Sequence, residues 1–317
     1  MSSLPTSANP DEPATAPAGR PFPLALFTPP STSTVPPPEP LTDAQKVKLK
    51  DMTGHFGRTD YVLAVNAGQG DGQEEKTGLE EREMMFLSHE TLVRFLIGCK
   101  NNATEAITRL EECLIWRRTE RIDDIDYMAE KCEEEIFMLE RATDLMTDGV
   151  TKLLLMFDFA GERKGPPTSV SVARECLHIL SHHYPEKLSL SIFLHVPLIA
   201  KIFINLMWPF VDANTKKKVR FGTDAVKDGD VEYDQLLKES GGGLDLPYDH
   251  ATYWPALIST CKERREDHLK RWRSLGEPMV GREERLFKVS PGKRQDAPPD
   301  NGDELPAGAA IGEHQTE

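Results

Sequence analysis

The sequence lacks the short motifs that mark the commonest enzyme classes. Neither a GxSxG nucleophile elbow nor a GxxxxGK[S/T] phosphate loop occurs in its 317 residues. Gly68, Gly70 and Gly72 form a GxGxG run, but no apolar strand leads into it and no helix opens behind it, as dinucleotide binding requires. The sequence therefore predicts no catalytic site and no enzyme.

Positive charge is also scarce, because 38 Lys and Arg residues stand against 52 Asp and Glu residues, a formal net charge of -14. Neutralising nucleic-acid phosphates needs a basic excess, so we expect no nucleic-acid partner. The five cysteines never form a CxxC pair, which favours reduced thiols in a cytoplasmic protein. No basic segment followed by an apolar run marks a secretory signal at the start.

Proline is unevenly spread, and half of the 24 prolines lie in the first 40 residues. We expect residues 1–40 to be a disordered arm and the acidic, Pro- and Gly-containing residues 289–317 to be a disordered tail. Between them the sequence predicts a small helical unit over 41–126 and a larger domain over 127–288.

The larger domain alternates between helical and strand patterns. The run VTKLLLMFDF at 150–159 is nearly continuous in apolar residues, which is typical of a strand covered on both faces. Alternating strands and helices with short connections predict an α/β fold with a mixed, mainly parallel sheet. The expected helices lie at 41–56 with Thr42 as N-cap, after the Ser88 N-cap, from Ala103 onward, and at 133–146, 170–183 and 198–210; the expected strands lie at 150–159 and 189–196, and a short helix and third strand fall within 212–221.

Four possible metal ligands gather on the helix expected at 170–183: Cys176, His178, His182 and His183. His178 and His182 have the i, i+4 spacing that can share a metal ion. No HExxH glutamate accompanies them, so we favour histidines that line the core and cap the helix, with a haem or zinc site as the minor alternative.

Residues 192–211 (IFLHVPLIAKIFINLMWPFV) form the most apolar stretch of the chain. We do not expect a membrane span, because Pro197 and Pro209 interrupt it and Lys201 alone would cost about 2.5 to 3.5 kcal/mol at the membrane centre. A helix that is apolar around most of its circumference must be buried in protein or face lipid. An ordinary buried crossover helix remains the alternative.

A dense basic run, with Lys216, Lys217, Lys218 and Arg220, follows this apolar helix. Such a run is usually a solvated surface, but beside an exposed apolar helix it favours anionic lipid. Thr215 and Lys218 are three residues apart and share one helical face, so together they could hold a phosphate or sugar group.

The segments RFLIGC, LIWRR, FMLER, LLLMFDF, HYPE, PFVDANTKKK and DLPYDHATYWPAL stand in one order along the chain. This series resembles the CRAL-TRIO lipid-binding family, and within it the fungal phosphatidylinositol transfer proteins of the pleiotropic-drug-resistance type. The resemblance extends over about residues 41–286, and the pairing of HYPE with PFxDxxTKxK is specific. It implies a helical N-terminal unit over 41–126 and a lipid-binding domain with a C-terminal helix over 127–288.

The resemblance implies that a lipid lies in an apolar cavity between the sheet and a mobile gate helix at 197–210. Headgroup contacts to phosphatidylinositol are implied for Glu186, Thr215 and Lys218. Leu153 and Leu155 would line the cavity from the strand. The gate residues implied to face lipid are Pro197, Leu198, Ile202, Phe203, Leu206, Met207 and Phe210.

The implied protein is cytoplasmic, touches membranes transiently at their surface, and carries phospholipid as ligand without any cofactor. Leu153 and Leu155 replace the hydroxyl residues of phosphatidylcholine-binding members, which argues against choline lipids and leaves sterol as a second ligand. Ile97 and Cys99 replace two family arginines after Arg94.

The family usually has a longer segment between LIWRR and FMLER, but only residues 119–136 stand there in this chain. Either the sheet has lost strands or the gene model lacks an exon. A scaffold or lipid-sensing module with an incomplete cavity is therefore the alternative to a transfer protein.

Overall fold

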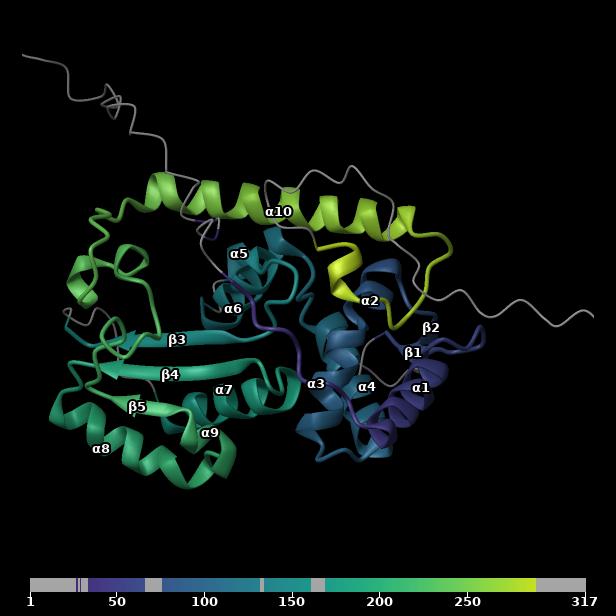
Figure 1. The fold of residues 1–317 in the computed structure, drawn as a ribbon, viewed down its shortest axis with the longest axis horizontal. Helices are drawn as coiled ribbons and strands as arrows, with labels where there is room; N and C mark the ends of the chain where they lie inside the picture. The colour runs from purple at the N-terminus through teal and green to yellow at the C-terminus, as the bar shows by residue number, and fades with distance from the viewer. Residues whose placement is uncertain are drawn as a thin grey trace, which may run out of the picture.

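The computed structural model of the protein describes residues 27, 29, 34–65, 76–131, 134–160 and 169–288. Most of the arm expected over 1–40, the GxGxG run and the tail over 289–317 lie outside the described residues. In Figure 1 a group of helices from the first part of the chain stands beside a three-stranded sheet with helices around it, and the long helix α10 runs along both.

The first part of the chain is helical, as predicted. Thr42 and Gln45 form a capping box at the start of α1, and the Ser88 hydroxyl accepts a hydrogen bond from the Thr91 N–H at the start of α3, so both expected N-caps are confirmed. The elements are α1 (Asp43–Phe56), β1 (Leu63–Ala64), β2 (Lys76–Thr77), α2 (Glu81–Phe86), α3 (His89–Gly98) and α4 (Ala103–Thr119).

The second part confirms the alternation of strands and helices. Its strands are parallel, in the order β3-β4-β5. The elements are α5 (Ile125–Lys131), α6 (Glu134–Leu145), β3 (Leu153–Asp158), α7 (Val170–His183), β4 (Leu188–Leu194), α8 (Leu198–Met207), η2 (Trp208–Phe210), α9 (Ala213–Lys217), β5 (Val219–Phe221), η3 (Tyr233–Gln235), η4 (Lys238–Ser240), α10 (His250–Ser274) and η5 (Glu284–Leu286).

Strand β3 is not covered on both faces, so that expectation was wrong. Its residues are half-buried or exposed, and 43% of the Phe157 surface is accessible. Leu154 and Met156 pack against Ile192 on one face, whereas Phe157 lies on the other. Within the described ranges β3 pairs with β4 alone, so its second edge has no strand beside it.

Helix α10 joins the two parts of the molecule. It has 25 residues, and it buries Leu257 and Cys261 in the cluster around α6 and Trp272 near α2. The resemblance implied a C-terminal helix without giving its bounds. Phe27, within the expected arm, also packs here, with its ring 6.1 Å from that of Tyr253.

The turn between α7 and β4 rests on the helical unit. A Cβ atom at Gly98 would lie 2.7 Å from the Cβ of Pro185, so only glycine lets α3 approach this closely. The buried Arg94 side chain donates from Nη1 to the Pro185 carbonyl at 3.3 Å. From α4, Arg109 donates to the carbonyls of Ser181 and His182 at the end of α7. The helical unit therefore positions the turn that carries Glu186.

Candidate functional site

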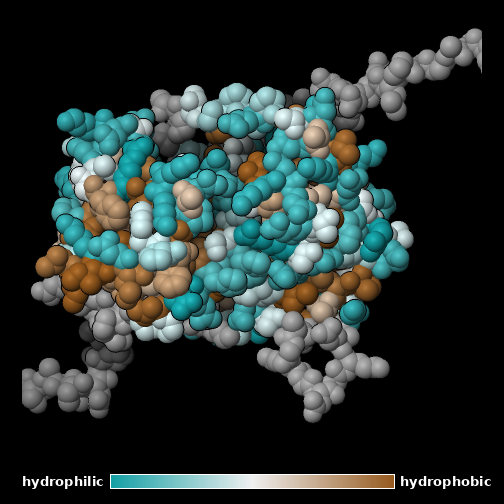
Figure 2. Space-filling model, turned by 90° about the horizontal axis from the view of Figure 1, so that it is seen from below, coloured by the Kyte–Doolittle hydropathy of each residue, from teal (hydrophilic) through white to brown (hydrophobic). Residues whose placement is uncertain are grey.

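Helix α8 presents an apolar face to the surface. Five side chains of α8, and Phe210 in the following turn η2, were expected to face lipid. Of these six, Met207 is buried and Phe203 is half-buried. Figure 2, seen from below, shows hydrophobic residues gathered on the side where α8 lies in Figure 1. An ordinary buried crossover helix is therefore excluded. The exposed apolar residues are Leu198, Ile199, Ile202, Leu206 and Phe210.

The helix expected over 198–210 ends earlier than predicted. It stops at Met207 and continues as the 3-10 turn η2, because Pro209 has no N–H to donate to the helix. Cations cover this turn: the Arg174 guanidinium lies 4.4 Å from the Phe210 ring centroid, and the Lys216 ammonium 5.9 Å from that of Trp208.

A row of three aromatic rings crosses the sheet, one from each strand. Phe157, Phe193 and Phe221 occupy the same register, with ring centroids 4.9 Å and 5.3 Å apart. Trp208, in the turn after α8, lies 6.3 Å from Phe221. This aromatic row was not predicted from the sequence, although each of the three strand segments carries a phenylalanine.

The two strand leucines differ in position. Leu155 is opposite Ser191 and two residues before Phe157, so it shares the face of the aromatic row. Leu153 packs instead against the core cluster that contains Phe137 and Leu257. The structure thus brings Leu155, but not Leu153, to the apolar face of the sheet.

Glu186 and Lys218 lie together at the start of the sheet, although 32 residues separate them in sequence. Lys218 Nζ is 3.2 Å from Glu186 Oε2, and each side chain is 24% exposed. The Lys218 carbonyl accepts from the Ser191 N–H at 2.7 Å, which fixes it beside β4. Glu186 has a left-handed backbone with φ 56°, which an L-residue adopts at a cost of about 1–2 kcal/mol. Both charged groups remain partly accessible and can each take a further partner.

Thr215 lies one turn before Lys218. Asp212 caps α9 by accepting from the N–H groups of Asn214 and Thr215 at 2.9 and 3.0 Å. Burial acts to raise the pKa of Asp212, but these hydrogen bonds and one from the Thr215 side chain hold it below its ordinary value. The cap therefore fixes the short helix that presents Thr215 and Lys218.

The basic run divides into different environments. Arg220 is paired with Asp230 at 2.7 Å, whereas Lys217 is exposed and Lys216 lies over Trp208. Lys218 is thus the member of the run that faces Glu186.

The histidines of α7 make structural contacts. His182 lies 2.7 Å from a Glu112 oxygen, and the ring of His183 stacks on Trp116 with centroids 4.3 Å apart. In the part of the chain that the structure describes, no group of three or more His, Cys, Asp or Glu side chains is arranged to hold a metal ion.

We expect the buried His183 to make the fold acid-sensitive. Burial lowers its pKa from 6.5 to about 3, so the unfolded chain binds more protons between these values and stability falls as pH drops from 6.5 towards 3. His183→Phe keeps an aromatic ring against Trp116 and should flatten this part of the profile, measured as thermal midpoints from pH 7.5 to 4. His250→Phe, at an exposed position, is the control. Parallel profiles for wild type and His183→Phe would contradict this assignment.

Two pockets among the described residues lie away from α8. One, of about 420 Å³, is lined by α2 and the end of α4; the other, of about 100 Å³, lies between the helical unit and the second part of the chain. No helix among the described residues is long and apolar enough to cross a membrane.

Comparison with known families gives two adjoining matches. Residues 48–112 match the CRAL/TRIO N-terminal domain, and residues 110–242 match the CRAL/TRIO domain. The matches meet within α4, whereas the boundary expected from sequence falls at residue 126.

Two curated fungal proteins are similar to this chain. A CRAL-TRIO domain-containing protein of Schizosaccharomyces pombe is 30% identical over 240 residues, which cover 64% of this chain and 23% of that protein. Phosphatidylinositol transfer protein PDR17 of Saccharomyces cerevisiae is 28% identical over 290 residues, which cover 75% of this chain and 82% of that protein. Among solved structures, the crystal structure of Sfh5 aligns with a TM-score of 0.42 and 15% identity, over 73% of this chain and 100% of that chain.

Proposed function

The chain belongs to the CRAL/TRIO family, and on this basis we propose that it binds phosphatidylinositol and transfers it between membranes without covalent chemistry. The observation that carries the proposal is the pair formed by Lys218 and Glu186, in a structure whose helix α8 exposes apolar side chains. The similarity to a phosphatidylinositol transfer protein supports it.

The chemistry of the lipid fits these surfaces. The Lys218 ammonium would pair with the phosphodiester, with the Thr215 hydroxyl beside it, and the Glu186 carboxylate would accept hydrogen bonds from inositol hydroxyls. The acyl chains would lie between α8 and the face of the sheet that carries Leu155 and the aromatic row. A sterol would use these apolar surfaces alone, as a second ligand.

Native mass spectrometry tests the proposal directly. After incubation with vesicles that contain phosphatidylinositol and phosphatidylcholine, the purified protein should carry one phosphatidylinositol molecule, because the headgroup residues select inositol over choline. Recovery of protein without any phospholipid, before and after incubation, would refute lipid binding.

We further propose that α8 contacts the membrane surface, so that the cytoplasmic protein associates with membranes peripherally. Ile202 is 61% exposed, and insertion of such a side chain into an apolar phase contributes about 1.5–3 kcal/mol. Ile202→Asp should therefore weaken binding to vesicles by about tenfold or more in a co-sedimentation assay. Val47→Asp on α1, at another position with 61% exposure, is the matched control. Equal binding by both variants would exclude α8 as the contact.

A scaffold or lipid-sensing role without transfer is the second candidate. Two observations favour it: β3 lies at an edge of the sheet, and Phe157 and Phe221 are exposed on the apolar face of the sheet, so the cavity for the lipid would be incompletely closed. Bound phosphatidylinositol without transfer between vesicles would support this role.

A further inference from the structure

A small cavity lies between the helical unit and the CRAL/TRIO domain, apart from α8 and the apolar face of the sheet. Its volume is about 100 Å³, and residues of α2, α3, α4, α6, α10 and the turn after α7 line it. A water molecule occupies about 30 Å³ in the liquid, so this space suits about three waters or one tetrahedral oxyanion. It is too small for a phospholipid.

Positive charge exceeds negative charge around this cavity. Six lining residues carry a lysine or arginine side chain, whereas four carry a carboxylate. Four of the cationic residues, Arg94, Arg117, Lys187 and Arg265, are buried, where uncompensated charge is costly. The six cationic residues are Arg82, Arg94, Arg117, Lys187, Arg265 and Lys288.

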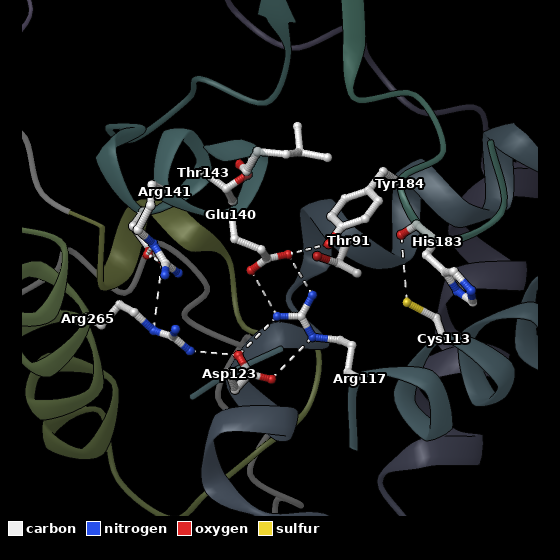
Figure 3. A network of polar contacts seen from close by, with 12 residues as sticks. Thr91, Cys113, Arg117, Asp123, Glu140, Arg141, Thr143, His183, Tyr184 and Arg265 are labelled. Atoms are coloured by element: carbon white, nitrogen blue, oxygen red, sulfur yellow. Dashed lines mark hydrogen bonds and ion pairs between the residues drawn. The ribbon is translucent and has the colours of Figure 1, made fainter. Parts of the chain in front are cut away.

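The carboxylates around the cavity already have partners. Arg117 donates to Glu140 at 2.8 Å and to Asp123 at 3.0 Å, and the Tyr184 hydroxyl donates to Glu140 at 2.7 Å (Figure 3). The other two carboxylates, Asp144 and Glu284, pair at 2.7 Å with Arg141 and Lys288, respectively.

Lys187 has no such partner among the described residues. The residue is 7% exposed, and its side-chain nitrogen lies 3.8 Å from the Met146 sulfur. Burial, and then the nearby Arg94, lower its pKa well below the ordinary value. Within the described ranges, this buried amine therefore has neither a counterion at ion-pair distance nor a strong hydrogen-bond acceptor.

Two neighbouring arginines have unused donors. Arg94, 8% exposed, donates to neutral oxygens only, the Thr91 hydroxyl and the Pro185 carbonyl. Arg265, also 8% exposed, pairs with Asp123 (Figure 3), but its Nη1 atom has no hydrogen-bond partner in the part of the chain that the structure describes. The cavity thus combines a point charge with planar donor groups, which is the chemistry that binds phosphate.

We propose that this cavity is a binding site for a dianionic tetrahedral oxyanion of the phosphate class, held by Lys187, Arg94 and Arg265. A bound dianion would offset the excess of cationic side chains around the cavity. Lys187 directly follows Glu186 in the turn between α7 and β4. The bound anion would therefore connect this turn to side chains of both domains.

Equilibrium dialysis of the full chain against radiolabelled inorganic phosphate, at constant ionic strength in chloride, tests the site. We expect saturable binding of one phosphate per chain, and a thermal midpoint that rises by several degrees with phosphate but not with added chloride. Lys187→Met should lose both effects. It should be at least as stable as wild type without phosphate, because it removes an unpaired buried charge. Lys270→Met, at an exposed position of α10, should bind phosphate like wild type.

The outcomes separate the possible sources of the anion. Unchanged phosphate binding after loading with phosphatidylinositol supports a separate site for a free oxyanion. Loss of phosphate binding on loading would overturn the proposal, because the phosphate would then occupy the headgroup site of the lipid. Wild-type protein that binds no phosphate overturns the proposal even if Lys187→Met fails to fold. Undiminished binding by a folded Lys187→Met variant overturns it as well.

Discussion

Replacing Lys218 with alanine is expected to abolish phosphatidylinositol transfer while the fold stays intact. The substitution removes the ammonium that would pair with the phosphodiester, and a hydrogen bond to a charged group contributes about 1.5–3 kcal/mol, or about 10- to 100-fold in affinity. The side chain is only partly buried, so stability should change little. Transfer of fluorescent phosphatidylinositol between vesicles measures the effect, with circular dichroism as the test of folding.

The neighbouring Lys217 provides the matched control. It lies on the same short helix, but it is exposed. Lys217→Ala should transfer lipid at nearly the wild-type rate, and Glu186→Ala should resemble Lys218→Ala because it removes the acceptor for inositol hydroxyls. If Lys218→Ala and Lys217→Ala behaved alike, the headgroup assignment would be wrong.

Replacing Arg117 with leucine should produce the largest loss of stability. Arg117 is 6% exposed and bonds Glu140, whose side chain is 8% exposed, so the variant would leave a buried carboxylate with the Tyr184 hydroxyl as its remaining partner (Figure 3). Breaking a buried ion pair by removing one partner costs about 3–5 kcal/mol. Urea unfolding at pH 7 should show this loss as a lower midpoint.

An exposed ion pair of the same type is the control for this measurement. Arg273 of α10 pairs with Glu81 of α2, and their side chains are 55% and 40% exposed. Because water screens such a pair, Arg273→Leu should lower the urea midpoint much less than Arg117→Leu does. Similar losses in the two variants would show that burial of the Arg117 network adds no stability.

Local signals predicted the elements of this fold well. The N-caps at Thr42 and Ser88 and the helix at 170–183 were found because capping and helical periodicity depend on residues only a few positions apart. The short helices α2 and α5 were missed because six or seven residues show too little periodicity.

Contacts between distant residues could not be predicted in this way. How far β3 is buried depends on which segments pack against its two faces. Its apolar run alone does not distinguish a strand buried on both faces from one with an exposed face. The Arg265 to Asp123 contact joins residues 142 apart. Thr215 and Lys218 were paired from their spacing on one helical face, whereas Glu186 was added through a family resemblance. Only the pairing of β4 with β5 brings Lys218 to Glu186.

The close approach of Gly98 to Pro185 limits how this protein can be recombined with its relatives. A chimera that joins its CRAL/TRIO domain to a foreign N-terminal domain would need a glycine at this contact, since any Cβ would collide with the proline. It would also need an arginine in the place of Arg94 to hold the Pro185 carbonyl. The two domains therefore have to be transferred together, because the CRAL/TRIO domain alone would lose the contacts that support the turn carrying Glu186.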